Sequence, residues 1–195
     1  MWNWKFYTAY NQILESNQSI EKGDYNKGSL LMNEASKKVP EIEDLHMLSD
    51  YYKGIDLLTK DKSIAALAIF EKYKDKLPPD YKIEDLIVQA KVGASFDKKD
   101  YQGFLEASKQ SLNIDSTSAI SFSTVASAYS CLYAEKGDIN DKVNTEKYLA
   151  KARKIDNKTK ENKEYYNLIE YRLSTRKLIK REDFVKQFPN GWTKN

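Results

Sequence analysis

The chain has 195 residues, of which 41% are hydrophobic and 12% aromatic, so it can bury a sizeable core and does not have the composition of a disordered protein. Its single cysteine and single histidine exclude an internal disulfide framework and a metal site built from several such side chains. The net charge of +3 is uneven, because residues 136–195 hold 16 lysines and arginines, including all four arginines, against nine acidic residues. Such asymmetry is typical of an interaction surface but does not name the partner.

Aromatic residues crowd the first ten positions of the chain. One interpretation is that they start the first helix and pack on its neighbour, since clustered aromatics usually belong to a core. The alternative is an interfacial aromatic belt that follows a transmembrane helix upstream of Met1. The chain itself shows no signal-peptide pattern and no strongly apolar run of about 18 residues. The residues concerned are Trp2, Trp4, Phe6, Tyr7 and Tyr10.

Four short strings, each a lysine followed by glycine or a polar residue, stand at one constant interval along the chain. Such strings are typical of a helix C-terminus that turns into the next helix. Apolar positions on both sides of each turn repeat at the same interval and with helical spacing, which predicts a series of helical hairpins. The four lysines, whose numbers give the repeat length, are Lys22, Lys60, Lys98 and Lys136.

Each hairpin has two apolar stripes that are buried only when hairpins stack. Pro40 and Pro78 are expected to end the second helix of the first two repeats. The charge-free stretch at residues 116–134 predicts a tightly packed inner helix. In the fourth repeat the apolar positions of the second helix slip by three residues, which predicts an enlarged turn at residues 137–144. The shifted positions are Thr145, Tyr148, Leu149 and Ala152.

After the repeats, residues 161–177 read as one further helix with an apolar and a charged face, as a capping helix needs for solubility. Residues 181–188 predict a last turn or two, and residues 190–195 are expected to be loose. We therefore predict a single all-α domain over residues 1–195. Its repeats lie at about 7–40, 41–78, 79–116 and 117–157, and the capping helix and tail at 158–195.

The second helices of the first two repeats share a pattern: a small residue, a bulky apolar residue four positions later, and a proline eight positions after that. The residues are Gly28, Met32 and Pro40, then Ala66, Phe70 and Pro78. Over residues 9–157 this resembles the tetratricopeptide repeat family, and Gly54 lies near that family's small position in the first helix. The resemblance implies a right-handed α-α superhelix. A related hairpin solenoid is the alternative, because the family's unit has about 34 residues and no tryptophan opens a repeat here.

A second, non-catalytic resemblance concerns the C-terminal half. The string Ala126-Ser127-Ala128-Tyr129, the pair Gly137-Asp138 and residues 171–179 look like a pattern in uncharacterised bacterial membrane-anchored proteins that have a helical-repeat soluble region. It implies the soluble region of a membrane-anchored protein, and a cytoplasmic protein is the alternative.

The sequence predicts no enzyme, no catalytic residue, no cofactor and no metal site. A Ser–His–acid arrangement would depend on His46, which lies near the start of a helix, where a histidine is usually solvated. Cys131 falls in an inner column, where a thiol is usually inert packing. No phosphate loop, zinc motif or EF-hand spacing is present.

The family resemblance implies a non-catalytic protein-binding scaffold whose first helices line a concave groove for a partner peptide. The matching positions carry no arginine or lysine, which argues against a carboxylate clamp. They are Asn11, Gln18, Ser49, Asp56, Ile87 and Ala94.

The alternative function is a membrane-tethered structural or assembly domain whose basic C-terminal end contacts anionic headgroups or an acidic partner. Arg172 and Arg176, four residues apart on one helix, are expected to carry that contact, since the guanidinium fork can grip a carboxylate or phosphate. A nucleic-acid partner is disfavoured because the basic residues lack an aromatic stacking platform.

Overall fold

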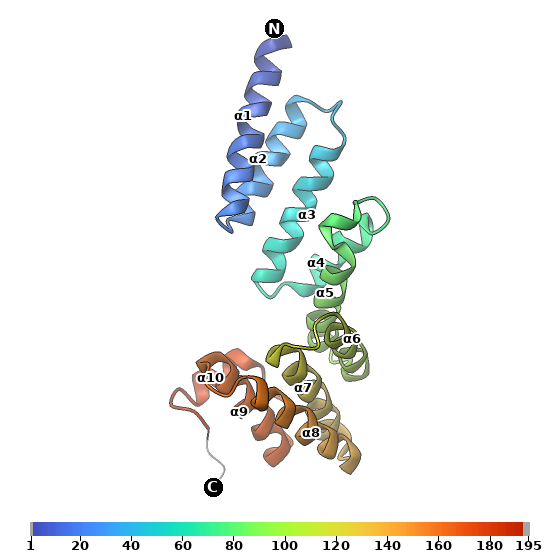
Figure 1. Cartoon of the computed structure of the whole chain (residues 1–195), viewed down its shortest axis with the longest axis vertical. Coiled ribbons are helices and arrows are strands. Elements are labelled where there is room, and N and C mark those ends of the chain that lie inside the picture. Colours follow the sequence, from blue (N-terminus) through green and yellow to red (C-terminus); the bar gives the residue numbers. More distant parts are fainter. Residues whose placement is uncertain (1, 193–195) are drawn as a thin grey trace. The chain divides into compact units, whose positions relative to one another are not determined.

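The computed structural model describes residues 2–192, and throughout that range the regular structure is helical (Figure 1). The prediction of an all-α fold is therefore confirmed for these residues. The elements are α1 (Trp2–Glu21), α2 (Tyr25–Lys38), α3 (Asp44–Thr59), α4 (Ser63–Tyr73), the short 3₁₀ helix η1 (Pro79–Tyr81), α5 (Ile83–Asp97), α6 (Tyr101–Ile114), α7 (Ala119–Lys136), α8 (Ile139–Ile155), α9 (Lys160–Thr175) and α10 (Arg181–Gln187).

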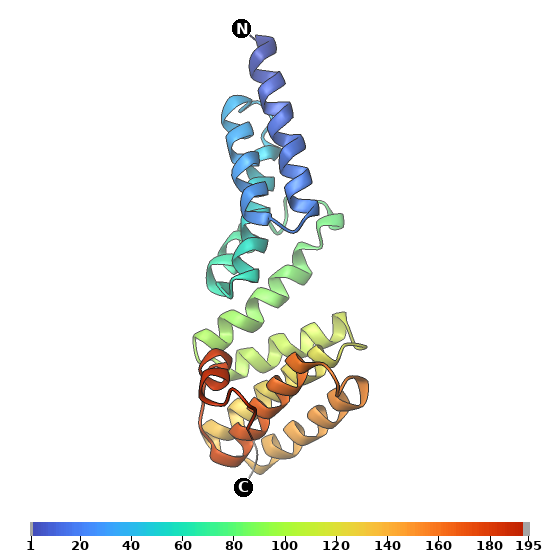
Figure 2. The same cartoon turned by 90° about the vertical axis from the view of Figure 1, so that its left-hand side faces the viewer.

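The chain separates into an N-terminal unit, residues 1–94, and a C-terminal unit, residues 95–195. In the N-terminal unit α1 packs on α2, α2 on α3 and α3 on α4. In the C-terminal unit α7 packs on α6, α8 and α9, which lie beside it, and α10 packs on α9 (Figure 2). Helices that follow one another in sequence are thus packed as neighbours, as a helical repeat requires. The single domain expected from the sequence stays a prediction.

The backbone repeats at the same interval as the sequence. The residue after each of the four repeat lysines adopts a left-handed conformation that ends one helix before the next begins. Glycine reaches this conformation without steric cost, whereas in aspartate and lysine it carries strain. These residues are Gly23, Asp61, Lys99 and Gly137, with φ angles of 79°, 55°, 59° and 76°.

The next position in each turn is the N-cap of the second helix. Asp24, Asp100 and Asp138 fill it in three repeats, and their carboxylates accept hydrogen bonds from backbone N–H groups of the first turn. Lys62 fills it in the second repeat and makes no such bond, although its backbone (φ −93°, ψ 54°) resembles that of Asp24 (φ −84°, ψ 72°). The N-cap position of the second repeat thus has a suitable backbone conformation but no side-chain hydrogen bond to the first turn.

Replacing Lys62 with aspartate is expected to stabilise the N-terminal unit by about 1 kcal/mol, the usual contribution of an N-cap carboxylate. The new side chain would accept from the backbone N–H of Ala65, as Asp24 does from that of Lys27 at 3.0 Å. Urea denaturation of Lys62→Asp and Lys62→Ala would measure the gain. Equal midpoints for the two variants would mean that the cap does not form.

Small and large residues complement each other in the N-terminal core. The Phe70 ring is fully buried and lies against Gly54, where a Cβ atom would come within 2.6 Å of the ring. Ala66, one turn earlier on α4, is also fully buried, and Tyr51, Tyr73 and residues of α5 complete the cluster. The contact between Gly54 and Phe70 explains why a small residue on α3 accompanies a bulky one on α4.

The C-terminal core is built around α7, as the charge-free stretch predicts. Its small side chains allow α6, α8 and α9 to pack closely. Seven residues of α7 show an exposure of 1% or less: Ser123, Val125, Ala126, Ser127, Ala128, Ser130 and Cys131.

Two predicted boundaries are wrong. Helix α4 ends at Tyr73, well before Pro78, so the proline does not end it. Helix α8 begins at Ile139, directly after its N-cap, so the turn of the fourth repeat is not enlarged. Thr145, Leu149 and Ala152 are nevertheless buried as predicted, because α8 presents a different face to its neighbours than the second helices of the earlier repeats do.

The N-terminal aromatics do not pack as the first interpretation expects. Trp4, Tyr7 and Tyr10 are exposed by 70%, 60% and 58%, so that interpretation is wrong for them. The side chain of Trp2, the last residues of the tail expected to be loose (193–195) and any segment upstream of Met1 lie outside the described residues. Among the helices of residues 2–192, none combines the length and apolarity needed to cross a membrane.

Candidate interaction surfaces

The six residues expected to line a groove are not brought together. Ser49, Ile87 and Ala94 are buried, with exposures of 5%, 5% and 2%. Ser49 donates a hydrogen bond to the carbonyl of Ser29 on α2 at 2.9 Å, and Ile87 belongs to the core around Phe70. Their burial corrects the expectation that they face a partner.

The other three lie at the surface or near it. Asn11 and Gln18 are exposed on α1. Asp56 on α3 is partly buried, and its carboxylate accepts from the ammonium group of Lys60 at 2.7 Å. Of the six predicted groove residues, only the two on α1 are therefore exposed.

The column that contains Asn11, Ser49 and Ile87 faces the preceding hairpin. Ser49 is bonded to α2, and Ile87 packs on residues of α3 and α4. Only in α1 is this column open to solvent. The interpretation of this column as a partner groove is therefore wrong for Ser49 and Ile87, because the preceding hairpin covers them.

Arg172 is buried and cannot contact headgroups. It is 2% exposed; its Nη1 donates to Ser127 Oγ at 2.8 Å and its Nη2 to the carbonyl of Ile179 at 3.0 Å. The guanidinium lies 5.4 Å from the centre of the Phe96 ring, which attracts a cation through its π face. The expectation of an exposed arginine is wrong here. The Ser127 hydroxyl, the Ile179 carbonyl and the Phe96 ring provide the guanidinium with the interactions that water would otherwise make.

Arg176 is exposed but directed back at the protein. It ends α9 with a left-handed φ of 56°, and its guanidinium lies 5.8 Å from the centre of the Tyr133 ring and close to the turn at Gly137. Two neighbouring cations are also engaged, since Lys180 pairs with Asp97 at 3.1 Å and Arg181 with Glu164 at 3.7 Å. Both arginines of α9 therefore make contacts within the C-terminal unit.

A groove of about 700 Å³ runs between α8 and α9 in the C-terminal unit. Leu173 supplies apolar surface, the buried Leu149 lies behind it, and Trp192 closes one side with its ring set edge-on against Tyr171 at 5.7 Å. Charged residues form the rim. Arg153 and Glu170 pair across it at 2.9 Å, and the other rim charges are Lys142 and Glu146.

The turn that joins α8 to α9 holds the two walls of the groove. The Asp156 carboxylate accepts from the backbone N–H of Lys158 at 2.8 Å, from the Thr159 hydroxyl and from the Asn162 amide at 2.9 Å. These hydrogen bonds, that from Thr159 foremost, lower the pKa of Asp156 to about 2. The carboxylate is therefore ionised at neutral pH and keeps the turn ordered.

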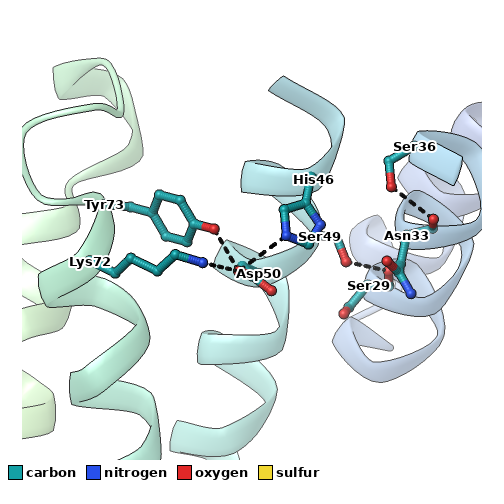
Figure 3. Close-up of polar contacts among 8 residues, drawn as sticks. All are labelled: Ser29, Asn33, Ser36, His46, Ser49, Asp50, Lys72 and Tyr73. Carbon is teal, nitrogen blue, oxygen red and sulfur yellow. Dashed lines mark hydrogen bonds and ion pairs between the residues drawn. The ribbon is translucent and has the colours of Figure 1, made fainter. Parts of the chain in front are cut away.

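Two separate sets of polar contacts link α3 to its neighbours in the N-terminal unit: the hydrogen bond from Ser49 to α2 and a cluster around Asp50 that includes residues of α4 (Figure 3). Asp50 accepts from the Tyr73 hydroxyl at 2.6 Å and from Lys72 Nζ at 3.1 Å, while His46 Nε2 lies 4.0 Å away. Burial alone would raise the pKa of Asp50, but the hydrogen bonds from Tyr73 and Lys72 outweigh it and lower the pKa. His46 lies on α3 like Asp50 and is 62% exposed, whereas Tyr73 and Lys72 come from α4. The contacts of Asp50 therefore hold α3 and α4 together.

Cys131 is fully buried, and this burial raises the pKa of its thiol. A thiol that is protonated at neutral pH and closed off from solvent is a poor nucleophile. Within residues 2–192, no group of three or more histidine, cysteine or acidic side chains is placed to hold a metal ion.

No protein-family model matches the chain, and comparisons with curated proteins and with solved structures find no match. The function has to be inferred from the geometry of the chain itself.

Proposed function

We propose that this protein is a non-catalytic scaffold of the tetratricopeptide-like type, which binds a segment of a partner protein in the groove between α8 and α9. The groove carries the proposal. Its volume of about 700 Å³ falls in the range typical of binding sites, about 300–1,000 Å³. The left-handed turn in every repeat and the contact between Gly54 and Phe70 support the superhelix.

The lining of the groove indicates the chemistry of the partner segment. Leu173 and Trp192 offer apolar surface for one aliphatic or aromatic side chain. Lys142 and Glu146, one turn apart on the rim, have no ion pair among the described residues. They can contact polar groups of either sign beside the apolar anchor, as expected for a mixed peptide.

A photo-crosslinker placed at Ala150 tests the groove, because this residue lines it and is exposed. We expect it to capture a defined protein that the same crosslinker at Ala68, on the exposed side of α4, does not capture. A synthetic peptide of the captured segment should bind Ala150→Trp at least about tenfold more weakly than wild type, since the indole fills the groove. Identical capture at both sites, or equal affinity for the variant, would refute the groove as the binding site.

The second candidate function is a membrane-tethered assembly domain that contacts an acidic surface, and one observation favours it. Lys147, Lys151 and Lys154 form an exposed stripe on α8 with spacings of four and three residues, and none has an ion pair in the described part of the chain. The basic contact surface would then lie on α8 and not on the arginines of α9. Salt-sensitive binding to anionic vesicles that is lost in Lys147→Glu/Lys151→Glu/Lys154→Glu would select this function.

A further inference from the structure

An uncharged aromatic stripe runs along the solvent side of α1. Trp4, Tyr7, Tyr10 and Leu14 are exposed by 70%, 60%, 58% and 43%, and their spacings of three and four residues place them on one face of the helix. Residues 6–14 contain no charged side chain. The outer face of a capping helix is normally polar, so this face of α1 does not have the character of a cap.

The corresponding face of α3, the first helix of the next repeat, is a packing surface. Leu45 and Leu48 replace Tyr7 and Tyr10, and they pack on apolar side chains at the end of α2: Met32, Ala35 and Val39. Ser49, which corresponds to Asn11, donates its hydroxyl hydrogen to the Ser29 carbonyl of α2. This face of α3 is therefore shaped to receive the second helix of the preceding hairpin.

The positions that match Tyr7, Asn11 and Leu14 are buried in α5 and α7, whereas those that match Trp4, Ile42 and Asp80, lie before their helices and are exposed. In α5, Ile83 and Ala90 are 5% and 0% exposed and belong to the core that includes residues of α3 and α4. In α7, Ser121, Val125 and Ala128 are 8%, 0% and 0% exposed. What is exposed in α1 is thus the stacking face of this repeat.

We propose that the stacking face of α1, formed by Trp4, Tyr7, Tyr10, Asn11 and Leu14, is a docking surface for an amphipathic helix of a partner protein. The helix packs on α1 as α2 packs on α3. Its apolar face carries small and aliphatic residues like Met32, Ala35 and Val39, and one of its carbonyls accepts from the Asn11 amide as the Ser29 carbonyl does from Ser49.

Two other occupants fit less well. A second copy of the chain cannot offer the face that α2 uses, because Met32, Ala35 and Val39 are already buried against α3, and its own α1 offers bulky aromatic side chains in place of small and aliphatic ones. Binding to a membrane surface is strengthened by cations beside the apolar face, and residues 6–14 supply none. The stacking face of α1 shares no residue with the groove between α8 and α9, and the two proposals stand independently.

A tandem duplication of residues 3–40 tests whether the face accepts such a helix. It places a second copy of α2 ahead of α1 in the natural repeat register and at high effective concentration. A cysteine at Leu14 of the downstream copy reports coverage through its rate of alkylation, in a Cys131→Ser background. We expect labelling at least about tenfold slower than in the single-copy Leu14→Cys chain. Equal rates at position 14 would overturn the proposal.

Ile120→Cys is the matched control for this experiment, because Ile120 is exposed on α7 and lies far along the chain from the duplicated segment. Its rate of alkylation should be the same with and without the duplication. A fall at both positions would mean that the duplicated chain hides cysteines in general, and the slower labelling at position 14 would then not support the proposal.

The full chain tests the other two occupants. Wild type and Tyr7→Lys/Leu14→Lys should both be monomeric by light scattering over a wide concentration range, and neither should sediment with phosphatidylcholine vesicles. Because both replaced side chains are exposed, the double variant should keep its melting temperature. Self-association of wild type that the double variant lacks would make the occupant a second copy, and vesicle binding lost in the variant would make it a membrane. Either result overturns the assignment to a partner helix.

Discussion

Replacing Ala66 with arginine is expected to destabilise the N-terminal unit by about 4 kcal/mol or more. Ala66 is fully buried on α4, one turn before Phe70, in the cluster formed with α3 and α5. An arginine there must either bury a charge without an acidic partner or push α4 away from its neighbours. Both outcomes disrupt the packing of α4 against α3 and α5.

Ala68→Arg is the matched control, because Ala68 lies on the same helix two residues further on and is exposed. It should change stability by less than about 0.5 kcal/mol. Since the chain has two compact units, hydrogen exchange of peptides from α3 and α4 reports the effect better than one global melting curve. Comparable protection in the two variants would mean that the repeat alignment which places Ala66 in an inner column is wrong.

The hairpins can be predicted from sequence because their signals are local. A lysine, a residue able to adopt positive φ and an aspartate N-cap recur at three of the four turns, and each acts within one helix end. The enlarged turn of the fourth repeat is wrong for a related reason. A shift of apolar positions by three residues looks the same in a sequence whether the turn is longer or the helix is rotated about its axis. Helix α8 begins at Ile139, at the position that the repeat interval predicts, so the helix is rotated and the turn is not longer.

The interaction surfaces depend on contacts that are distant in sequence, so they can be predicted only in part. The sequence interpretation assigns Asn11 and Ser49 to a partner groove, but a sequence column does not show whether another helix of the chain covers it. The polarity of Ser49 suggests exposure, although its hydrogen bond to α2 lets it be buried. The groove between α8 and α9 depends on Trp192, whose position beside Tyr171 no periodic pattern indicates.

Arg172 shows the same limit for a charged residue. Arginine is seldom fully buried, and a position on a helix beside other basic residues indicates contact with solvent. The partners that bury it come from elsewhere: Ser127 from α7 and Phe96 from α5. A serine-rich, charge-free helix is visible in the sequence and is the one signal that could have suggested a buried polar contact.

Reversing the charge at Arg172 is accordingly expected to have a large effect on the C-terminal unit, about 4 kcal/mol or more for Arg172→Glu. The carboxylate would be buried against the Phe96 ring and would face the Ile179 carbonyl, an acceptor it cannot hydrogen-bond. The segment after α9, which the bond to Ile179 holds in place, should lose its protection from hydrogen exchange together with α7 and α9.

Arg176→Glu, one turn further on, should cost less than about 1 kcal/mol, because its side chain is exposed and its contact with the Ala134 carbonyl is long at 3.4 Å. Arg172→Met distinguishes the effect of losing the charge from the effect of losing side-chain volume. It keeps most of the buried side chain and removes a guanidinium whose Nε has no hydrogen-bond partner, so its loss of stability should be clearly smaller than that of Arg172→Glu. If Arg172→Glu and Arg176→Glu proved equally mild, Arg172 would have to be solvent-exposed, and the role of α9 as a basic contact surface would return.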